Sequence, residues 1–304
     1  MDSMMKKASA WVNSMRLRTL PLSVSGIILA SCLAAREGYF SWTIFILAIL
    51  TTLSFQILSN LANDYGDGLK GTDNEQRIGP ERAIQSGKIT PKEMRTGIII
   101  NVILALIFSV ILIFTAFGTS HGVLVLIFLI LGIASIAAAI KYTVGNSAYG
   151  YHGLGDIFVF IFFGLVSVIG GYVLFAKSLT SIVYLPAVVI GLLSAGVLNL
   201  NNLRDIVSDE ASNKNTLAVK LGVKSTKIYH NVLIISALAL SALFGILYFQ
   251  SYYSLMFIIS FIPLLQHLNR FNKNKVPKLL DPELKKLALS TVLLAILMGL
   301  GQVF

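Results

Sequence analysis

The chain alternates long apolar runs with short polar connections. A helix needs about 20 residues to cross a bilayer, and nine runs approach or reach that length. They cover about 20–36, 40–63, 97–117, 121–140, 155–176, 180–202, 230–250, 252–269 and 285–303. The pattern predicts an all-α integral membrane protein with nine transmembrane helices in one bundle. We therefore expect residues 1–304 to form a single domain.

The basic residues predict how the bundle is oriented. If the N-terminus is inside, all of the 24 Lys and Arg residues except Arg36 and Lys177 fall on the inner side. Because Lys and Arg favour the cytoplasmic side, we expect a cytoplasmic N-terminus and an outer C-terminus in the cell membrane. All of the 14 acidic residues except Glu37 and Asp156 share the inner side. The polar chemistry therefore faces the cytoplasm.

Composition agrees with a membrane protein. The chain is 56% hydrophobic and 12% charged, whereas soluble domains carry about 25% charged residues. Its net charge of +10 indicates topology and contact with anionic membrane lipid. No aromatic and basic pattern typical of nucleic-acid binding accompanies that charge, so we expect no nucleic-acid partner.

A first group of carboxylates follows the second apolar run. Asn60 and Asp64 are four residues apart and Asp67 is three further on, so a continuing helix places them on one face. Carboxylates beside an apolar segment of membrane length need a counter-ion. Their oxygens suit Mg²⁺, and Arg77 and Arg82 are suited to phosphate oxygens.

A second group repeats the device at the end of the sixth run. Asn201, Asp205 and Asp209 are four residues apart, again on one helical face. The acidic motifs at 60–87 and 201–216 are thus a pseudo-repeat. Facing each other, they would form a cage for two metal ions with a diphosphate between them.

Such a cage suits ionisation of an allylic diphosphate. Metal ions neutralise the departing group, and a dry pocket protects the carbocation from water. Aromatic faces stabilise positive charge. Aromatic residues placed near the inner face are Tyr65, Tyr142, Tyr149, Tyr151 and Phe158.

Three segments carry a resemblance to a known family. They read NDYGDGLKGTDNEQRIGPERAIQSGKIT, YTVGNSAYGYHGLGDIFVFIFFGLVSVIGGY and NNLRDIVSDEASNKNTLAVKLG. Together they resemble the UbiA superfamily of intramembrane aromatic prenyltransferases. The R-x-G-P-x-R and Y-G-Y-x-G-L-G-D runs within them resemble the branch that acts on 1,4-dihydroxy-2-naphthoate.

The resemblance implies a Mg²⁺-dependent transfer from a polyprenyl diphosphate to 1,4-dihydroxy-2-naphthoate. The acceptor loses its carboxylate, which gives demethylmenaquinone for menaquinone synthesis. The implied metal ligands are Asn60, Asp64, Asp67, Asn201, Asp205 and Asp209, with the four aspartates catalytic. The implied diphosphate contacts are Arg77, Arg82 and Lys214, and the implied aromatic-substrate contacts are Arg16, Arg18, Lys141, Tyr142 and Tyr149. Asp73 takes the place of a further acidic position that many members have two residues earlier, where this chain has Gly71, and Asp156 ends the Y-G-Y-x-G-L-G-D run; the roles of both are left open.

Two alternative functions are open at this stage. One is a sibling prenyltransferase that acts on 4-hydroxybenzoate or haem, against which the two runs of the naphthoate branch argue. The other is a non-catalytic cation or lipid transporter, which would need polar groups through the full depth of the membrane. The residues leave open the prenyl chain length, the oligomeric state, and whether the loop 270–286 binds lipid or caps the site.

Overall fold

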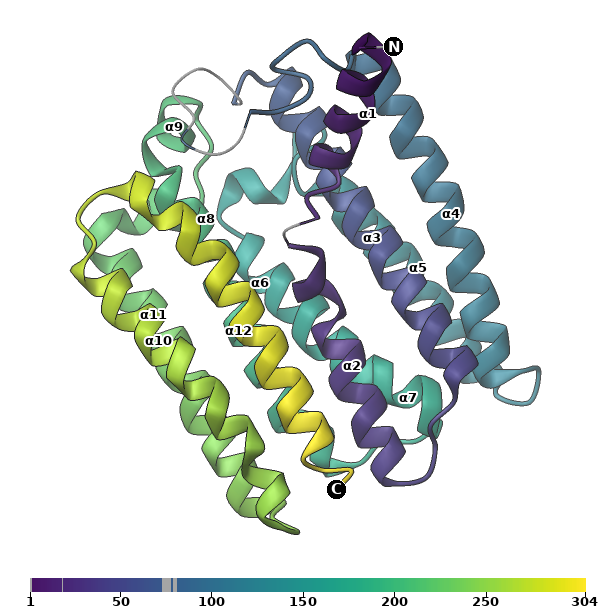
Figure 1. Ribbon diagram of the computed structural model, residues 1–304. Coiled ribbons are helices and arrows are strands. Elements are labelled where there is room, and N and C mark those ends of the chain that lie inside the picture. The colour runs from purple at the N-terminus through teal and green to yellow at the C-terminus, as the bar shows by residue number, and fades with distance from the viewer. Residues whose placement is uncertain (1, 18, 73–77, 79–80) are drawn as a thin grey trace.

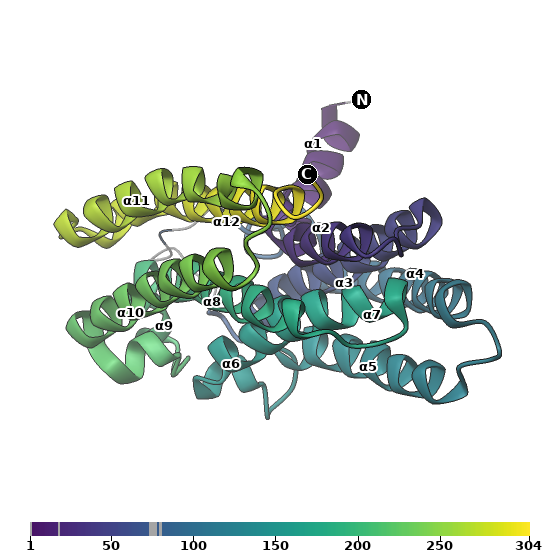
Figure 2. The same cartoon turned by 90° about the horizontal axis from the view of Figure 1, so that it is seen from below.

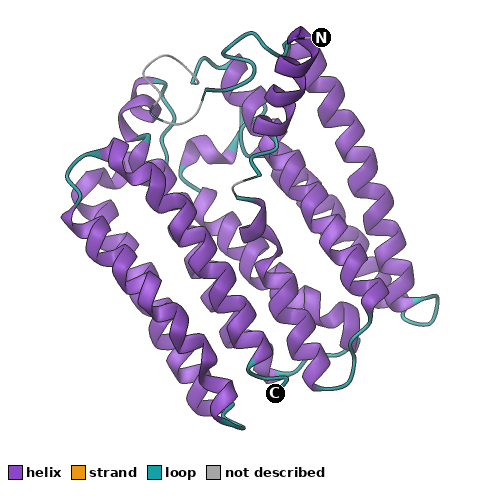
Figure 3. Ribbon diagram, viewed as in Figure 1, coloured by secondary structure: helices purple, strands orange, loops and turns teal. Residues whose placement is uncertain are grey.

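The computed structural model describes residues 2–17, 19–72, 78 and 81–304 as a helical bundle, and those ranges contain no strand (Figures 1 and 3). The α-helices are α1 Asp2–Ser14, α2 Leu20–Arg36, α3 Trp42–Leu69, α4 Pro91–Phe117, α5 Gly122–Lys141, α6 Gly155–Val159, α7 Gly171–Ala176, α8 Tyr184–Arg204, α9 Ile206–Ala211, α10 Leu217–Leu247, α11 Phe261–Lys273 and α12 Asp281–Leu300. Shorter or wider helical segments are η1 Tyr149–His152, η2 Phe160–Gly170, η3 Ser181–Val183, η4 Tyr252–Ser260 and η5 Pro277–Leu280.

All nine apolar runs lie largely in helix. Within the described ranges, six helical segments are long and apolar enough to cross a membrane: 42–69, 91–117, 122–141, 155–176, 181–204 and 217–247. Helix α2 is apolar but shorter, α11 has only 13 residues after η4, and α12 begins with a charged turn. The all-helical membrane architecture is therefore confirmed, while the nine spans and the orientation stay predictions.

The outside of the bundle is apolar. Helix α5 carries no charge before its last residue, and Val123, Leu126, Ile130 and Ile133 are each more than half exposed. A helix that is apolar all round belongs in a protein core or in lipid. Because these side chains face outward, the surface is suited to hydrocarbon rather than to water.

Helix α8 lies at the centre of the packing. Its apolar residues, including Ile190, Leu193 and Leu200, are fully buried in the main core. It approaches η2 closely because glycines meet there: a Cβ on Gly164 would lie 2.6 Å from the Cα of Gly191. Small residues allow such close approach between membrane helices. This contact holds the middle of α8, whose carboxyl end begins the second acidic group, against η2.

The segment 155–176 departs from a regular helix. Its middle, η2, is an 11-residue π-helix between α6 and α7. Such i→i+5 segments are rare and often occur at functional sites.

The topology brings both acidic groups to one end of the bundle. The carboxyl ends of α3 and α8 and the start of α12 lie at the end that holds the N-terminus, and the C-terminus lies at the opposite end (Figure 1). Seen from below, α2 and α12 are neighbours at one face, while α5 and α6 lie at the other (Figure 2).

Candidate active site

A cavity of about 780 Å³ opens at the end of the bundle that carries both acidic groups, and it continues between the helices. All six predicted metal ligands line it: Asn60, Asp64, Asp67, Asn201, Asp205 and Asp209. Along α3 its lining runs from Asp67 to Ala48, which is about 28 Å at 1.5 Å per residue. The deeper part is lined mainly by apolar residues such as Leu112, Phe128 and Leu174. The cavity therefore combines a charged mouth with an apolar depth of nearly membrane thickness.

Helix α3 continues through the first acidic group, as its spacing predicts. Asp64 is buried, and its Oδ1 accepts a hydrogen bond of 2.8 Å from Nη2 of Arg16. Arg82 Nε lies 3.5 Å from the same oxygen. The other oxygen, Oδ2, is buried without a hydrogen-bond partner in the described part of the chain. Asn60 is held from both sides, because it donates to the carbonyl of Met15 and accepts from Gln56.

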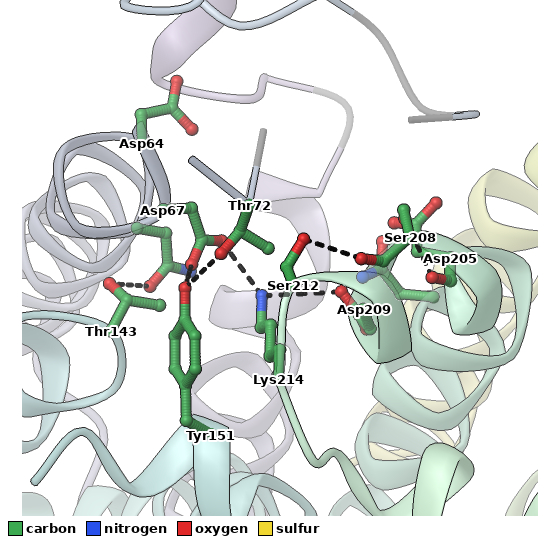
Figure 4. Close-up of polar contacts among 12 residues, drawn as sticks. Asp64, Asp67, Thr72, Thr143, Tyr151, Asp205, Ser208, Asp209, Ser212 and Lys214 are labelled. Atoms are coloured by element: carbon green, nitrogen blue, oxygen red, sulfur yellow. Dashed lines mark hydrogen bonds and ion pairs between the residues drawn. The ribbon is translucent and has the colours of Figure 1, made fainter. Parts of the chain in front are cut away.

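Lys214 joins the two acidic groups (Figure 4). Its Nζ lies 3.0 Å from Oδ2 of Asp67 and 3.9 Å from Oδ1 of Asp209. Tyr151 donates a hydrogen bond of 2.8 Å to the other oxygen of Asp67, and Thr72 lies 2.6 Å from the Tyr151 hydroxyl. Because Tyr151 gives its proton to Asp67, Thr72 is the donor in that second contact. Asp67 is thus fully engaged by one cation and one phenol.

These contacts set the protonation of groups at the mouth. Burial lowers the pKa of the Lys214 ammonium, but Asp67 and Asp209 overcome that effect and hold the pKa well above its usual value. Burial and the negative charge of Asp67 both raise the pKa of the Tyr151 phenol. Lys214 therefore stays charged and Tyr151 stays a neutral donor across the ordinary pH range.

The second acidic group keeps helical spacing across a break between α8 and α9. The amide of Asp205 bonds to the carbonyl of Asn201, and the amide of Asp209 bonds to the carbonyl of Asp205. Both carboxylates are buried. The predicted single face is therefore present, although α8 ends at Arg204.

Arg204 is a site residue that sequence reasoning missed. It is 3% exposed, and its Nε and Nη2 bind the two oxygens of Asp205 at 2.8 and 2.6 Å. Its Nη1 binds Asp281 at 2.6 Å, and Nη2 also binds Asn201 at 2.9 Å. The first turn of α12 is thereby tied to the second acidic group. The loop 270–286 therefore ends against the site.

One wall of the cavity is aromatic. Tyr142, Tyr149, Phe158 and Phe162 line it, with Tyr149 stacked on Phe158 at 3.9 Å between ring centroids. This wall is fixed to α3 through a close contact: a Cβ on Gly66 would lie 2.7 Å from the backbone carbonyl of Thr143. The first acidic group and the aromatic wall therefore form one rigid corner.

Several predicted residues fall elsewhere. Arg18, Asp73 and Arg77 lie outside the described residues. Lys141 is exposed and does not line the cavity, so its contact with the aromatic substrate stays a prediction without geometric support. Asp156 is buried but also lies away from the cavity lining.

A histidine pair was not foreseen in the sequence. His230 and His267 are 37 residues apart in the chain, yet their Nε2 atoms lie 2.9 Å apart in the buried space between α10 and α11. His267 Nδ1 lies 2.8 Å from Oε2 of Glu283. No short spacing signals such a pair, because two antiparallel helices bring it together.

The oxygen donors fit Mg²⁺ by their chemistry. Four carboxylates and two amides line one cavity mouth, and a buried oxygen of Asp64 lacks a partner among the described residues. Oxygen-only donor sets suit Mg²⁺, and one or two carboxylates with substrate phosphates commonly suffice. Three or more acidic side chains do not converge on a point in the described ranges. Arg16, Arg204 and Lys214 instead neutralise the carboxylates.

Comparisons with known proteins agree with this geometry. Residues 24–280 match the UbiA prenyltransferase family. The chain is 42% identical to the 1,4-dihydroxy-2-naphthoate octaprenyltransferase of Escherichia coli (strain K12), over 99% of this chain and 97% of the relative. It is 35% identical to the enzyme of that name from Mycobacterium tuberculosis, over 76% of each chain. Among solved structures, a UbiA homolog from Archaeoglobus fulgidus bound to GPP and Mg²⁺ aligns with a TM-score of 0.64 at 15% identity, covering 95% of this chain and 99% of that one.

Proposed function

This chain belongs to the UbiA prenyltransferase family, and we propose that it transfers a polyprenyl group from a polyprenyl diphosphate to 1,4-dihydroxy-2-naphthoate. The acceptor loses its carboxylate as CO₂, and the products are diphosphate and the prenylated naphthoquinol, which is the reduced form of demethylmenaquinone. One observation of the structure carries the proposal. The two acidic groups, which come from distant parts of the chain, meet at the mouth of one cavity. That cavity continues about 28 Å along α3 between apolar helices.

The mouth suits the diphosphate. Asn60, Asp64, Asp67, Asn201, Asp205 and Asp209 would hold Mg²⁺. We propose two ions. Bound there, Mg²⁺ supplies neutralisation of the charge that develops on the departing diphosphate. Arg16, Arg82 and Lys214 already lie beside these carboxylates, from which they can turn to the diphosphate oxygens. Arg77 would join them.

The deeper cavity suits the prenyl chain and the cation. The apolar lining takes up the isoprenoid tail, whose entry from lipid explains why the enzyme lies in the bilayer. As the allylic C–O bond breaks, Tyr142, Tyr149 and Phe158 exclude water from the carbocation and face it with aromatic surface. The electron-rich ring of the acceptor attacks that carbon, and the new C–C bond forms.

The direct test is a reconstituted reaction. Membranes that contain the protein are incubated with Mg²⁺, 1,4-dihydroxy-2-naphthoate and a polyprenyl diphosphate, and the product and CO₂ are measured. We expect a prenylated naphthoquinol and one CO₂ for each diphosphate released. Absence of both products would refute the proposal, and prenylation of 4-hydroxybenzoate instead would assign the chain to a sibling activity. Full activity in Asp64→Ala or Asp205→Ala would refute the assigned metal ligands.

We also propose nine spans, with the site on the cytoplasmic side of the cell membrane. The supporting observation is that both acidic groups and the N-terminus share one end of the bundle, opposite the C-terminus (Figure 1). A reporter fused after Phe304 tests the orientation. Alkaline phosphatase fused there should be active and green fluorescent protein dark. The reverse result would place the C-terminus inside.

A further inference from the structure

Six basic residues of the described chain line the cavity, and five of them have a carboxylate partner. The pairs are Arg16 and Arg82 with Asp64, Lys88 with Glu81, Arg204 with Asp205, and Lys214 with Asp67. The sixth is Lys285, which has no ion-pair or hydrogen-bond partner among the described residues. A cation in a substrate cavity without an internal counter-ion is available to an anionic group of the substrate.

Lys285 lies inside the mouth rather than above it. It follows Asp281 by one helical turn on α12, and α12 runs from the mouth toward the opposite end of the bundle (Figure 1). Asp281 is the residue that Arg204 binds at 2.6 Å. Lys285 therefore lies about 6 Å further into the bundle than Asp281 along the helix axis. Lys285 and the second acidic group line the same cavity.

The backbone of this turn is firmly held. Besides the Asp281 contact, Glu283 is buried and accepts hydrogen bonds from Arg270 at 2.8 Å and Lys286 at 2.7 Å. His267 contacts the same carboxylate at 2.8 Å. The helix is thus anchored on one side to α8 and on the other to α11. Only the side chain of Lys285 has to be ordered when an anion binds, which limits the entropic cost.

We propose that Lys285 binds the carboxylate of the aromatic acceptor. This inference rests on the proposed function, since it assumes an acceptor that carries a carboxylate. The diphosphate meets the cations that already accompany the metal-binding carboxylates, whereas the acceptor's single negative charge needs a cation of its own.

The exposure of Lys285 suits a carboxylate that must later depart. Lys285 is exposed and lines the cavity, and an exposed ion pair is weaker than a buried one because water screens it. A tightly buried pair would stabilise the carboxylate against its loss as CO₂. An ammonium that water screens can orient the acceptor through its carboxylate without preventing the later loss of that carboxylate as CO₂.

The test compares acceptors with and without the carboxylate. Initial rates are measured for Lys285→Gln, Lys285→Arg and wild type, using 1,4-dihydroxy-2-naphthoate and its carboxylate-free analogue 1,4-dihydroxynaphthalene. We expect Lys285→Gln to raise the KM for the naphthoate about fivefold, the upper end for one exposed ion pair. Its KM for the diphosphate and its rate with the analogue should stay within twofold. Lys285→Arg should restore most of the naphthoate KM.

The matched control is Lys224→Gln, which removes the same charge from an exposed position on α10 away from the cavity. It should behave as wild type, and thermal unfolding checks that all variants are folded. An unchanged preference for the naphthoate in Lys285→Gln overturns the proposal, as does a rise in the diphosphate KM alone. Should wild type fail to use the naphthoate, the proposed function fails instead, and the pair 4-hydroxybenzoate and phenol then tests Lys285 in the same way.

Discussion

Replacing Lys214 by Met should destabilise the protein while strengthening its response to Mg²⁺. Lys214 is 9% exposed and lies 3.0 and 3.9 Å from oxygens of Asp67 and Asp209. With an effective dielectric constant of about 20, Coulomb's law gives about 5.5 and about 4 kcal/mol of attraction at these distances. Part of this is offset by the cost of burying the ammonium. Removing one partner of such a buried pair costs about 3–5 kcal/mol.

Thermal unfolding in detergent measures this effect. At about 2 °C per kcal/mol for a chain of this size, Lys214→Met should unfold about 6–10 °C below wild type. Millimolar Mg²⁺ should then raise the unfolding temperature more in the variant, because a divalent cation no longer competes with the ammonium for Asp67 and Asp209. Lys224→Met removes an exposed charge and serves as control. A variant that unfolds with wild type and gains nothing extra from Mg²⁺ would refute Lys214 as the internal counter-ion.

Three further predictions concern other contacts. Gly66→Ala should lower the free energy of unfolding by about 1–3 kcal/mol, because the new Cβ would lie 2.6–2.7 Å from atoms of Thr143. The control Gly122→Ala has open space around it and should leave the unfolding temperature unchanged. Equal unfolding temperatures for the two variants would contradict the close contact between Gly66 and Thr143. Arg204→Lys keeps the positive charge but loses the bidentate hydrogen bonds to Asp205, so kcat should fall by about tenfold or more. Full activity of this variant would show that the bidentate contact is not needed. The difference in unfolding free energy between wild type and Lys214→Met should stay constant from pH 7.5 to about 9.5. The pKa of the Lys214 ammonium is raised above the ordinary lysine value of 10.5, so the ammonium stays charged over this range in both the folded and the unfolded protein. A difference that disappears between these pH values would contradict the raised pKa.

The spacing of the acidic residues predicts which of them share a helical face, and there is a physical reason for this. An apolar run that continues as a helix fixes the faces of the residues at its end, so the spacing of Asn60, Asp64 and Asp67 predicts that they share one face of α3. The same reasoning placed Asp205 and Asp209 together. Alternating membrane crossings predict that both acidic groups lie at the same end of the bundle, and there they line one cavity.

Contacts between distant segments could not be predicted in this way. Arg204 is adjacent to Asp205, and adjacent residues on a helix do not normally face each other. The helix ends there, and the guanidinium then reaches both Asp205 and Asp281, which is 77 residues away. Tyr151 meets Asp67 across 84 residues. Nothing in the local pattern encodes such pairs.

Hydropathy also does not record the hydrogen-bonding pattern of a helix. The apolar run 155–176 predicts one transmembrane helix without saying how it is hydrogen-bonded, and 11 of its residues form the π-helix η2. The runs 252–269 and 285–303 are apolar, but the first starts as the 3₁₀ segment η4 and the second continues a helix whose charged first turn serves the site. Apolar content predicts burial in lipid or protein, and neighbouring helices decide the rest.

The bridge of Lys214 between Asp67 and Asp209 has a thermodynamic consequence. The ammonium occupies oxygens that a divalent cation would need, so a metal ion that arrives alone must displace it and leave it uncompensated. A diphosphate offers the displaced ammonium a new partner. Metal and diphosphate should therefore bind with positive cooperativity, and by reciprocity each must raise the affinity of the other by the same factor. The resting protein would thus discriminate against free divalent ions and accept them together with its substrate.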